Sequence, residues 1–368
     1  MGFLFHIVPT MLILGVLIFV HELGHFLACR FAGVGVEKFS IGFGPELLSW
    51  QGKETRYSLS LIPFGGFVKP SGETIEEIKE RGEKMKKGDF LAASVWNRFL
   101  ILIAGVTMNF LFAYILFAAV LVIGRPMPSN VIGGFVAGYP AEKSGLKVGD
   151  HVTQVNGKAV SNWQDLTLQI LQSKGSDIKF SVKRNETIQD ISVVPQYEKG
   201  KDIFGQAKQV PRIGIQPSEE FIVERYSVSD SIVKAAQFEW SLVTLTYEAL
   251  WRLITGQLSF KTISGPIGIV SMAGNAAKMG IIALMQFAAV LSVSLGVINS
   301  LPIPALDGGH LFFLAIEAVR RKALSIKIQE RVTQIGFYFL MALMVLVVFN
   351  DLVNIGALAK LKSLFTPS

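Results

Sequence analysis

The sequence predicts a polytopic α-helical membrane protein of about four transmembrane helices, with one extracytoplasmic α+β domain and a membrane-associated β-hairpin. Only 17% of the 368 residues are charged, whereas soluble domains average about 25%. The charge is missing from four long apolar stretches, and about 20 apolar residues are enough to cross a bilayer. These stretches are residues 4–20, 99–124, 281–306 and 332–350.

The first stretch predicts a retained span rather than a cleaved signal peptide. The chain opens with Met-Gly-Phe-Leu-Phe-His, so no basic segment precedes the apolar run. No small-residue cleavage pattern follows it either, because the run continues directly into His21 and Glu22. We therefore expect a transmembrane helix at residues 1–30.

Basic residues predict the orientation of the chain. The net charge is +7, and much of the basic charge lies in the connections between spans one and two and between spans three and four. Basic connections remain in the cytoplasm, so the external domain and both termini are expected to be extracytoplasmic. Because these residues set topology and no aromatic side chains alternate with them, no nucleic-acid partner is expected. The single cysteine, Cys29, excludes a disulfide framework.

An HExxH motif, His21-Glu22-Leu-Gly-His25, lies at the inner end of the first span. Histidines four residues apart share one face of a helix and can bind the same Zn²⁺ ion. Glu22 beside them is placed to take a proton from the attacking water. Ionisable groups within a membrane span are costly, and they usually mark a functional site.

The third zinc ligand is expected from the end of the third span, because a catalytic zinc ion usually has three protein ligands. Asp307 is the best candidate, since spans one and three run in the same direction and end in the same leaflet. Pro302 and Pro304 interrupt the helix just before it. His310 remains the alternative ligand. Glu317 is expected to be a solvated or interfacial charge.

The motifs resemble those of the site-2 proteases, which are intramembrane zinc metalloproteases of regulated intramembrane proteolysis. The resemblance rests on HELGH at residues 21–25 and on Asn-x-x-Pro-x-Pro-x-Leu-Asp-Gly at residues 299–308. Four further stretches match the RseP-type branch, and they are Gly42-Phe-Gly-Pro45, residues 62–69, Gly105-x-x-x-Asn109 and residues 264–269.

This resemblance implies specific roles for residues of this chain. One Zn²⁺ ion per chain would be bound by His21, His25 and Asp307, with Glu22 as the general base. Asn299 would hold the substrate backbone or the reacting carbonyl. The other implied substrate-binding residues are Pro302, Pro304, Gly65 and Gly66.

Residues 125–200 resemble a PDZ domain of the protease-associated type. A strand from Val131, a turn at Asn156-Gly157 and a helix capped by Asn162 carry this resemblance. It implies peptide binding by strand addition beside a loop formed by Gly133, Gly134 and Phe135. A size filter that binds nothing tightly is the alternative role. The best-known RseP proteins carry two PDZ domains, and we expect a single-PDZ form here.

The remaining segments complete the expected organisation. Residues 57–69 are expected to form the membrane-associated hairpin and to hold substrate in an extended form, since a helical substrate hides its carbonyls. An amphipathic helix over residues 229–255 is expected to lie at the outer surface. The expected boundaries are 31–96 for the cytoplasmic-side loops, 97–124 for the second span, 201–280 for the linker and amphipathic helix, 281–310 for the third span, 311–331 for the cytoplasmic loop, 332–352 for the fourth span and 353–368 for the tail.

We therefore expect an intramembrane zinc endopeptidase in the bacterial cytoplasmic (inner) membrane. By resemblance, its substrates are single-span proteins already trimmed outside, such as anti-sigma factors, or remnant signal peptides. Membrane lipid and a peptide ligand of the PDZ domain are further expected partners. One alternative is a non-enzymatic scaffold that binds peptide tails. Another is a metal transporter, which would need ionisable groups at several depths, whereas spans two and four have none.

Overall fold

The computed structural model describes residues 2–80, 85–173, 177–201, 206–322 and 324–355, which form two compact units. Unit 1 contains residues 1–120, 229–251 and 259–368, and unit 2 contains residues 121–228 and 252–258. Most of the expected tail, residues 356–368, lies outside the described residues.

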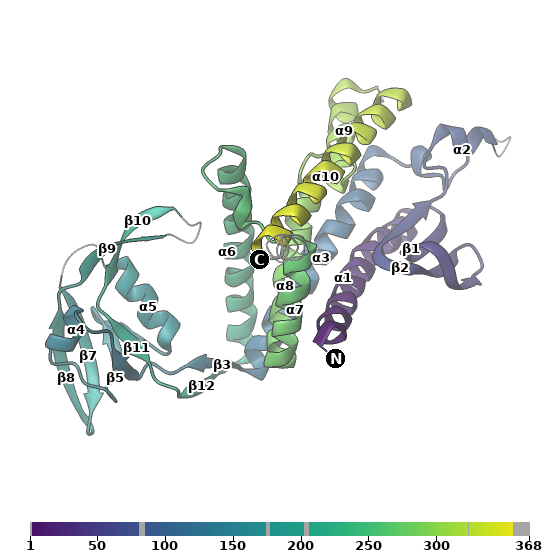
Figure 1. Ribbon diagram of the computed structural model, residues 1–368. Helices are drawn as coiled ribbons and strands as arrows, with labels where there is room; N and C mark the ends of the chain where they lie inside the picture. Colours follow the sequence, from purple (N-terminus) through teal and green to yellow (C-terminus); the bar gives the residue numbers. More distant parts are fainter. Residues whose placement is uncertain (1, 81–84, 174–176, 202–205, 323, 356–368) are drawn as a thin grey trace, which may run out of the picture. The chain divides into compact units, whose positions relative to one another are not determined.

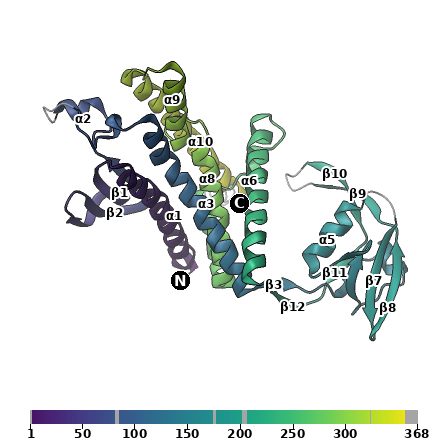
Figure 2. The ribbon, with the colours of Figure 1, turned by 180° about the vertical axis from the view of Figure 1, so that it is seen from behind.

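Unit 1 is a helical bundle with a small sheet (Figures 1 and 2). Four of its helices are long and apolar enough to cross a membrane, and the spans are His6–Ala32, Val95–Ile123, Ile281–Ser300 and Lys327–Asn354. Its helices are α1 (Gly2–Ala32), α2 (Ile75–Glu80), α3 (Val95–Ile123), α6 (Val228–Ile254), α7 (Pro266–Met279), α8 (Ile281–Ser300), α9 (Asp307–Arg320) and α10 (Ile326–Asn354), with 3₁₀ turns η1 (Phe90–Ala92) and η2 (Phe260–Thr262). These four spans agree with the expectation of a polytopic membrane protein.

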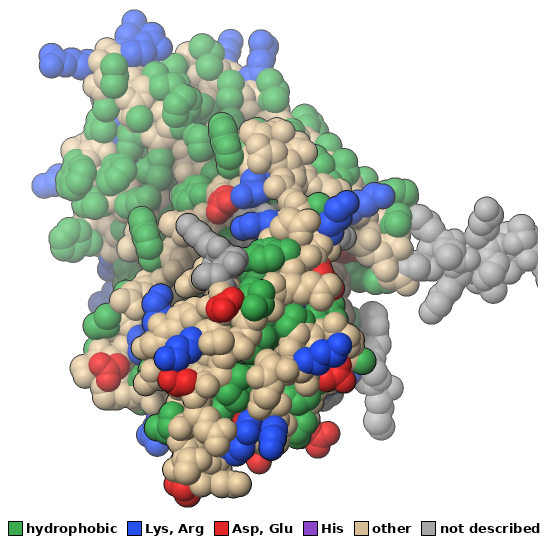
Figure 3. Space-filling model, turned by 90° about the vertical axis from the view of Figure 1, so that its left-hand side faces the viewer, with side chains coloured by type: hydrophobic (Ala, Val, Ile, Leu, Met, Phe, Trp, Pro, Cys, Tyr) green, Lys and Arg blue, Asp and Glu red, His purple; other side chains and the backbone are tan. Residues whose placement is uncertain are grey.

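Exposed side chains follow the expected membrane pattern. On the face shown in Figure 3, hydrophobic side chains dominate the helical bundle, and Lys and Arg side chains gather at the end that carries the α9–α10 turn. The basic residues at this turn are all exposed, and they are Arg320, Arg321, Lys322, Lys327 and Arg331.

The third span breaks where the prolines predicted. Helix α8 ends at Ser300 and α9 starts at Asp307. Glycine is required at the start of α9, because a Cβ on Gly308 would lie 2.1 Å from the carbonyl oxygen of Leu301. This close approach allows the chain to fold back tightly and to place Asp307 at the first turn of the new helix.

The small sheet of unit 1 differs from the expected hairpin. Residues 57–69 do not reverse on themselves, because they lie within one strand, β2 (Arg56–Pro70), that pairs with β1 (Val36–Gln51). Residues 38–41 pair on one side with 66–69 and on the other with 56–59, and residues 56–60 pair in turn with 46–51. The reversal occurs instead at Gly52, whose N–H donates to the carbonyl of Thr55.

The end of α10 clamps the start of α7. The carboxylate of Asp351 accepts hydrogen bonds from the backbone N–H groups of Gly265, Ile267 and Gly268, at 2.9, 3.0 and 3.0 Å. Asp351 is only 4% exposed. A carboxylate at a helix N-terminus satisfies free N–H groups and interacts favourably with the helix dipole. The polar ends of two helices are thereby joined inside the bundle.

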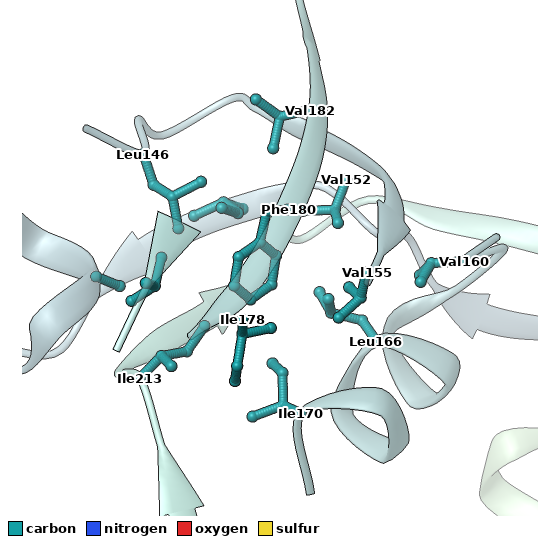
Figure 4. Packing of buried hydrophobic residues seen from close by; sticks show 13 residues of the cluster. Leu146, Val152, Val155, Val160, Leu166, Ile170, Ile178, Phe180, Val182 and Ile213 are labelled. Atoms are coloured by element: carbon teal, nitrogen blue, oxygen red, sulfur yellow. The ribbon is translucent and has the colours of Figure 1, made fainter. Parts of the chain in front are cut away.

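Unit 2 is an α+β domain built around Phe180 (Figure 4). Its central sheet has the order β6-β5-β7-β8. Helix α5 (Trp163–Gln172) packs Leu166 and Ile170 into the same core. The strands are β3 (Arg125–Pro128), β4 (Ile132–Phe135), β5 (His151–Val155), β6 (Lys158–Ala159), β7 (Ile178–Arg184), β8 (Thr187–Val193), β9 (Gln196–Lys201), β10 (Ala207–Arg212), β11 (Ile215–Pro217) and β12 (Phe221–Glu224), with the short helix α4 (Pro140–Lys143).

An ion pair between the half-buried Arg184 and the buried Asp150 stabilises one edge of this core. The guanidinium of Arg184 donates to both carboxylate oxygens of Asp150, at 2.7 and 2.6 Å, and the N–H of Lys147 donates at 2.8 Å. Burial would raise the pKa of Asp150, but these donors outweigh it and hold that pKa below its usual value. Asp150 therefore stays ionised at neutral pH.

Unit 2 extends beyond residue 200, the expected end of the PDZ-like domain. Strand β11 pairs with β4, and β12 pairs with β3, so residues 207–228 belong to unit 2 rather than to a linker. Ile213 is 2% exposed and lies in the core of this unit. The sequence did not reveal this, because the partner strands lie about 80–100 residues earlier in the chain.

We predict that Asp351→Leu loosens the start of α7. Hydrogen bonds to a charged group each contribute roughly 1.5–3 kcal/mol, so hydrogen exchange at Gly265, Ile267 and Gly268 should become at least about tenfold faster. Hydrogen-exchange mass spectrometry of the full chain in detergent measures this change. Asn354→Ala is the matched control at the same end of α10, since its side chain donates a long hydrogen bond, 3.4 Å, to the carbonyl of Lys261. Equal exchange in the two variants would contradict the clamp.

Candidate metal centre

Three predicted ligands meet in unit 1. Nε2 of His21 lies 3.0 Å from Oδ2 of Asp307, and Nε2 of His25 lies 3.5 Å from the same oxygen. The two Nε2 atoms lie 3.2 Å apart. Among the described residues, His21, His25 and Asp307 form a group that could hold one metal ion.

The spacing of these three atoms fits a tetrahedral zinc site. Bonds of about 2.0–2.1 Å to nitrogen and oxygen place neighbouring ligand atoms about 3.3 Å apart in a tetrahedron. The three measured separations, 3.0, 3.2 and 3.5 Å, scatter around that value. The donor set is also suitable, since two imidazoles and one carboxylate are ordinary ligands of catalytic zinc. The residues present therefore fit the zinc ion that the sequence implies.

Local structure explains why the three ligands converge. His21 and His25 are one helical turn apart on α1, so their side chains project from the same face. Asp307 is the first residue of α9, directly after the break in the third span. The side chains of the three ligands are only 12–20% exposed. The site is thus a mostly buried polar cluster at the end of an apolar helix.

Glu22 lies between the ligands and strand β2. Its carboxylate interacts electrostatically with His21, His25 and Asp307, and it accepts a hydrogen bond from the backbone of Val68. Gly66 lies so close that a Cβ there would be 3.3 Å from Cγ of Glu22. The general base predicted from the sequence is therefore next to both the ligand cluster and a strand.

A cavity of about 650 Å³ opens beside the cluster. The ligands, Glu22 and His310 line it together with side chains from β2, α3, α9 and α10. Its wall is apolar at Phe67, Val68 and Phe313, and it is polar at Glu73 and Gln334. A chain segment with mixed side chains could lie in this cavity and reach Glu22.

His310 lines the cavity without joining the ligand cluster, and three other predicted site residues do not line it. His310 faces the cavity and contacts Phe313, but it is not part of the group of three. Asn299 lies in the last turn of α8. Asn299, Pro302 and Pro304 are absent from the described residues that line the cavity. Their role in substrate binding stays a prediction.

Glu317 differs from its expected role as a solvated charge. Its two carboxylate oxygens accept hydrogen bonds from Arg98 of α3 at 2.6 and 3.1 Å, and both side chains are less than one-fifth exposed. Both residues line the cavity. The sequence could not show this pair, since the two residues are 219 positions apart.

The predicted peptide-binding loop of unit 2 is a strand. Gly133, Gly134 and Phe135 belong to β4, and β4 pairs with β11. A Cβ on Gly133 would lie 2.3 Å from the carbonyl oxygen of Pro217. On the other side, Ile132 exchanges backbone hydrogen bonds with Gly149 and Asp150. One edge of β4 is thus taken by β11, which pairs with β4 alone among the described strands, and the role of Gly133, Gly134 and Phe135 in peptide binding stays a prediction.

The sequence matches to known proteins are to proteases. The model of Peptidase family M50 matches residues 9–343. A Clostridium acetobutylicum protein named as a zinc metalloprotease is 37% identical over 355 residues, covering 95% of this chain and 98% of that protein. The regulator of sigma-W protease RasP of Bacillus subtilis is 30% identical over 422 residues, covering 94% of this chain and 98% of that protein. The crystal structure of a PDZ domain of an SdrC-like protein from Listeria monocytogenes aligns with 24% of this chain and 87% of that domain, with 22% identity and a TM-score of 0.20.

The geometry predicts that Asp307, and not His310, is the third ligand. Asp307→Ala should lose most of its bound zinc during dialysis against a chelator, because two histidines alone hold the ion weakly. His310→Ala is the matched control on the same helix, and it should keep about one zinc per chain. Metal analysis of the purified proteins measures both. Zinc loss in the His310 variant and retention in the Asp307 variant would reverse the assignment.

Proposed function

Because the chain belongs to peptidase family M50, the site-2 proteases, we propose that this intramembrane zinc protease cuts transmembrane segments of single-span proteins during regulated intramembrane proteolysis. The observation that carries the proposal is the cluster of His21, His25 and Asp307 with Glu22 at the end of an apolar helix. A non-enzymatic scaffold is not favoured, since the family and its named relatives are proteases.

Each residue of the cluster has a defined task in peptide hydrolysis. A bound zinc ion polarises the scissile carbonyl and lowers the pKa of water. His21, His25 and Asp307 would hold that ion and leave one position open for the reacting groups. Glu22 would take one proton from the water that attacks the carbonyl carbon. When the C–N bond breaks, Glu22 would return this proton to the leaving amine and regain its charge.

Strand β2 is suited to hold the substrate in an extended form. A transmembrane helix must unwind before cleavage, since its own hydrogen bonds occupy the carbonyls. Residues 66–69 pair with 38–41 on one side, and no partner strand is present on the other side among the described residues. A substrate segment added at this free edge would pass Gly66 and Val68, which both lie beside Glu22.

The orientation follows from the basic residues. We assign the α9–α10 turn, with its five exposed Lys and Arg residues, to the cytoplasmic side of the inner membrane. With this assignment, the metal centre lies near the cytoplasmic leaflet, at the inner ends of α1 and α8. Unit 2 and both termini lie on the extracytoplasmic side in this arrangement.

The substrate class rests on the resemblance and on unit 2. We assign unit 2 as a single PDZ domain that acts outside the membrane, either as a size filter or by binding a peptide along β11. In both roles, bulky ectodomains are excluded until another protease has removed them. Trimmed anti-sigma factors and remnant signal peptides meet this requirement. The relative in Bacillus subtilis carries a name that links it to sigma-W regulation.

We predict that Glu22→Gln abolishes cleavage and retains zinc. Glutamine has almost the same shape but cannot take a proton, so turnover should fall by at least about 10²–10⁴-fold. A panel of single-span proteins, each with and without its ectodomain, is incubated with both enzymes in detergent and analysed by gel electrophoresis. Only the trimmed forms should be cut, and only by the wild type. Wild-type rates in the variant would refute the assigned base, and equal cutting of untrimmed forms would refute the substrate class.

A second prediction concerns the strand beside the base. In Gly66→Ala, the new Cβ would meet the carbonyl oxygen of Ser40 at 2.8 Å and Cγ2 of Ile18 at 2.9 Å, so the strand must shift away from Glu22. Displacements of about 1 Å can cost roughly 10²-fold in rate. We therefore expect a lower kcat and unchanged zinc content. Gly15→Ala on α1 is the control, since a Cβ there meets nothing within 4 Å. Unchanged turnover in the Gly66 variant would argue against substrate binding at this edge.

A further inference from the structure

Helix α3 contacts the outer nitrogen of both metal-binding imidazoles. Nδ1 of His25 lies 2.7 Å from the backbone carbonyl oxygen of Ile101. Nδ1 of His21 lies 3.1 Å from Nδ2, the amide nitrogen of Asn109. Both histidines direct Nε2 toward Asp307. The same helix therefore contacts, in each ring, the nitrogen that does not face Asp307.

Gly105 makes this contact possible. A Cβ at this position would lie 2.3 Å from Nε2 of His25 and 2.8 Å from Cε1 of His21. On the facing helix, a Cβ at Gly24 would lie 2.5 Å from the carbonyl oxygen of Ala104. Glycine on each helix thus brings the two backbones close enough for α3 to reach the imidazoles. Gly105 and Asn109, the two fixed positions of the Gly105-x-x-x-Asn109 motif, which had no assigned role in the sequence, both lie at this contact.

The chemistry of a metal-binding histidine defines what α3 must provide. A neutral imidazole carries one hydrogen on its two nitrogens, so Nε2 can bind a metal only when that hydrogen is on Nδ1. The Nδ1–H group then needs an acceptor, which in metal sites is usually a carboxylate, a carbonyl or water. The carbonyl of Ile101 meets this need for His25. For His21, the side-chain amide that lies beside Nδ1 is that of Asn109, and its oxygen could do the same.

Asn109 is buried in the bundle where its side chain can accept a hydrogen bond from His21. It is 1% exposed, and its Oδ1 is buried without a hydrogen-bond partner among the described residues. Its backbone carbonyl accepts a hydrogen bond of 2.7 Å from the hydroxyl of Ser292, which is itself 0% exposed on α8. Rotating the amide by 180° exchanges its nitrogen and oxygen with little other movement. That rotation brings Oδ1, the acceptor without a partner among the described residues, to hydrogen-bond distance from Nδ1 of His21.

We propose that Asn109 is a positioning residue of the metal centre. Its amide oxygen accepts the Nδ1–H of His21, which fixes the tautomer and the ring orientation in which Nε2 binds zinc. The inference rests on the proposed function, because it assumes that His21 is a zinc ligand. It adds an outer contact on α3 to the three ligands on α1 and α9.

The test compares variants with the same number of side-chain heavy atoms that differ in hydrogen-bond acceptance. Asn109→Leu removes the acceptor and Asn109→Asp retains one, and both keep a branched side chain of four heavy atoms. Zinc affinity of the full chain in detergent is measured by competition with a chromophoric chelator, without substrate. We expect Asn109→Leu to bind zinc about 10–100-fold more weakly and Asn109→Asp to bind it nearly as tightly as the wild type. Thr107→Val, on the exposed face of α3, is the matched control and should leave the affinity unchanged.

The outcomes separate this inference from the proposed function. If Asn109→Leu binds zinc like the wild type, while Asp307→Ala has lost it, the role of Asn109 is refuted and the metal centre stands. If Asp307→Ala and His21→Ala also retain wild-type affinity, the metal centre itself is wrong. Equal weakening in the Leu and Asp variants would show a packing effect and would refute the hydrogen bond. Asn109→Ala, which removes the acceptor without adding apolar bulk, decides the question if the Leu variant does not fold.

Discussion

Two imidazoles and one carboxylate must stay within 3.5 Å of one another in a bundle whose other residues are mainly apolar. Such groups are costly to bury unless each is paired or binds a metal. The remaining features of unit 1 follow from this requirement. The first span has to carry its polar turn inside the bundle, and the third has to stop near it. Helix α3 has to lie close enough to contact Nδ1 of both imidazoles.

The break in the third span shows how irregular backbone is accommodated at this depth. Between Ser300 and Asp307 the chain turns through Ala305, which has a positive φ of 84°. Alanine rarely adopts this conformation, so the surrounding structure must enforce it. The carbonyl of Pro304 packs directly against Gly336 of α10, where a Cβ would lie 2.0 Å away. The fourth helix thereby covers part of the loop that positions Asp307, as expected for irregular backbone at membrane depth, which needs protein around it.

Features that depend on short stretches of sequence could be predicted, and features that depend on distant partners could not. The four spans follow from local hydropathy, and the pairing of His21 with His25 follows from helical spacing. Membership of the protease family and its use of zinc are confirmed by the family match and the named relatives. The preference for Asp307 over His310 needed topology, and the structure places only Asp307 in the cluster. The site assignments themselves stay predictions.

The errors have a common physical origin. The hairpin was expected within residues 57–69, but both halves of β2 pair with residues 38–41 instead. The local sequence carries no pattern that predicts this pairing. The loop at Gly133–Phe135 is a strand because β11, about 80 residues later, completes it. The contact between Asn109 and His21 joins residues 88 positions apart. In each case the deciding partner is distant in sequence, and no periodicity or composition reveals it.

The clamp between Asp351 and the start of α7 has a mechanical consequence. Helix α7 packs against α1, the helix that carries His21 and Glu22. Helix α10 is the least buried of the four spans, with 6% of its apolar window buried against 28–33% in the others. The Asp351 end of α10 is thus linked to α1 through α7, so a displacement of α10 at this end would be passed on to the helix that carries His21 and Glu22.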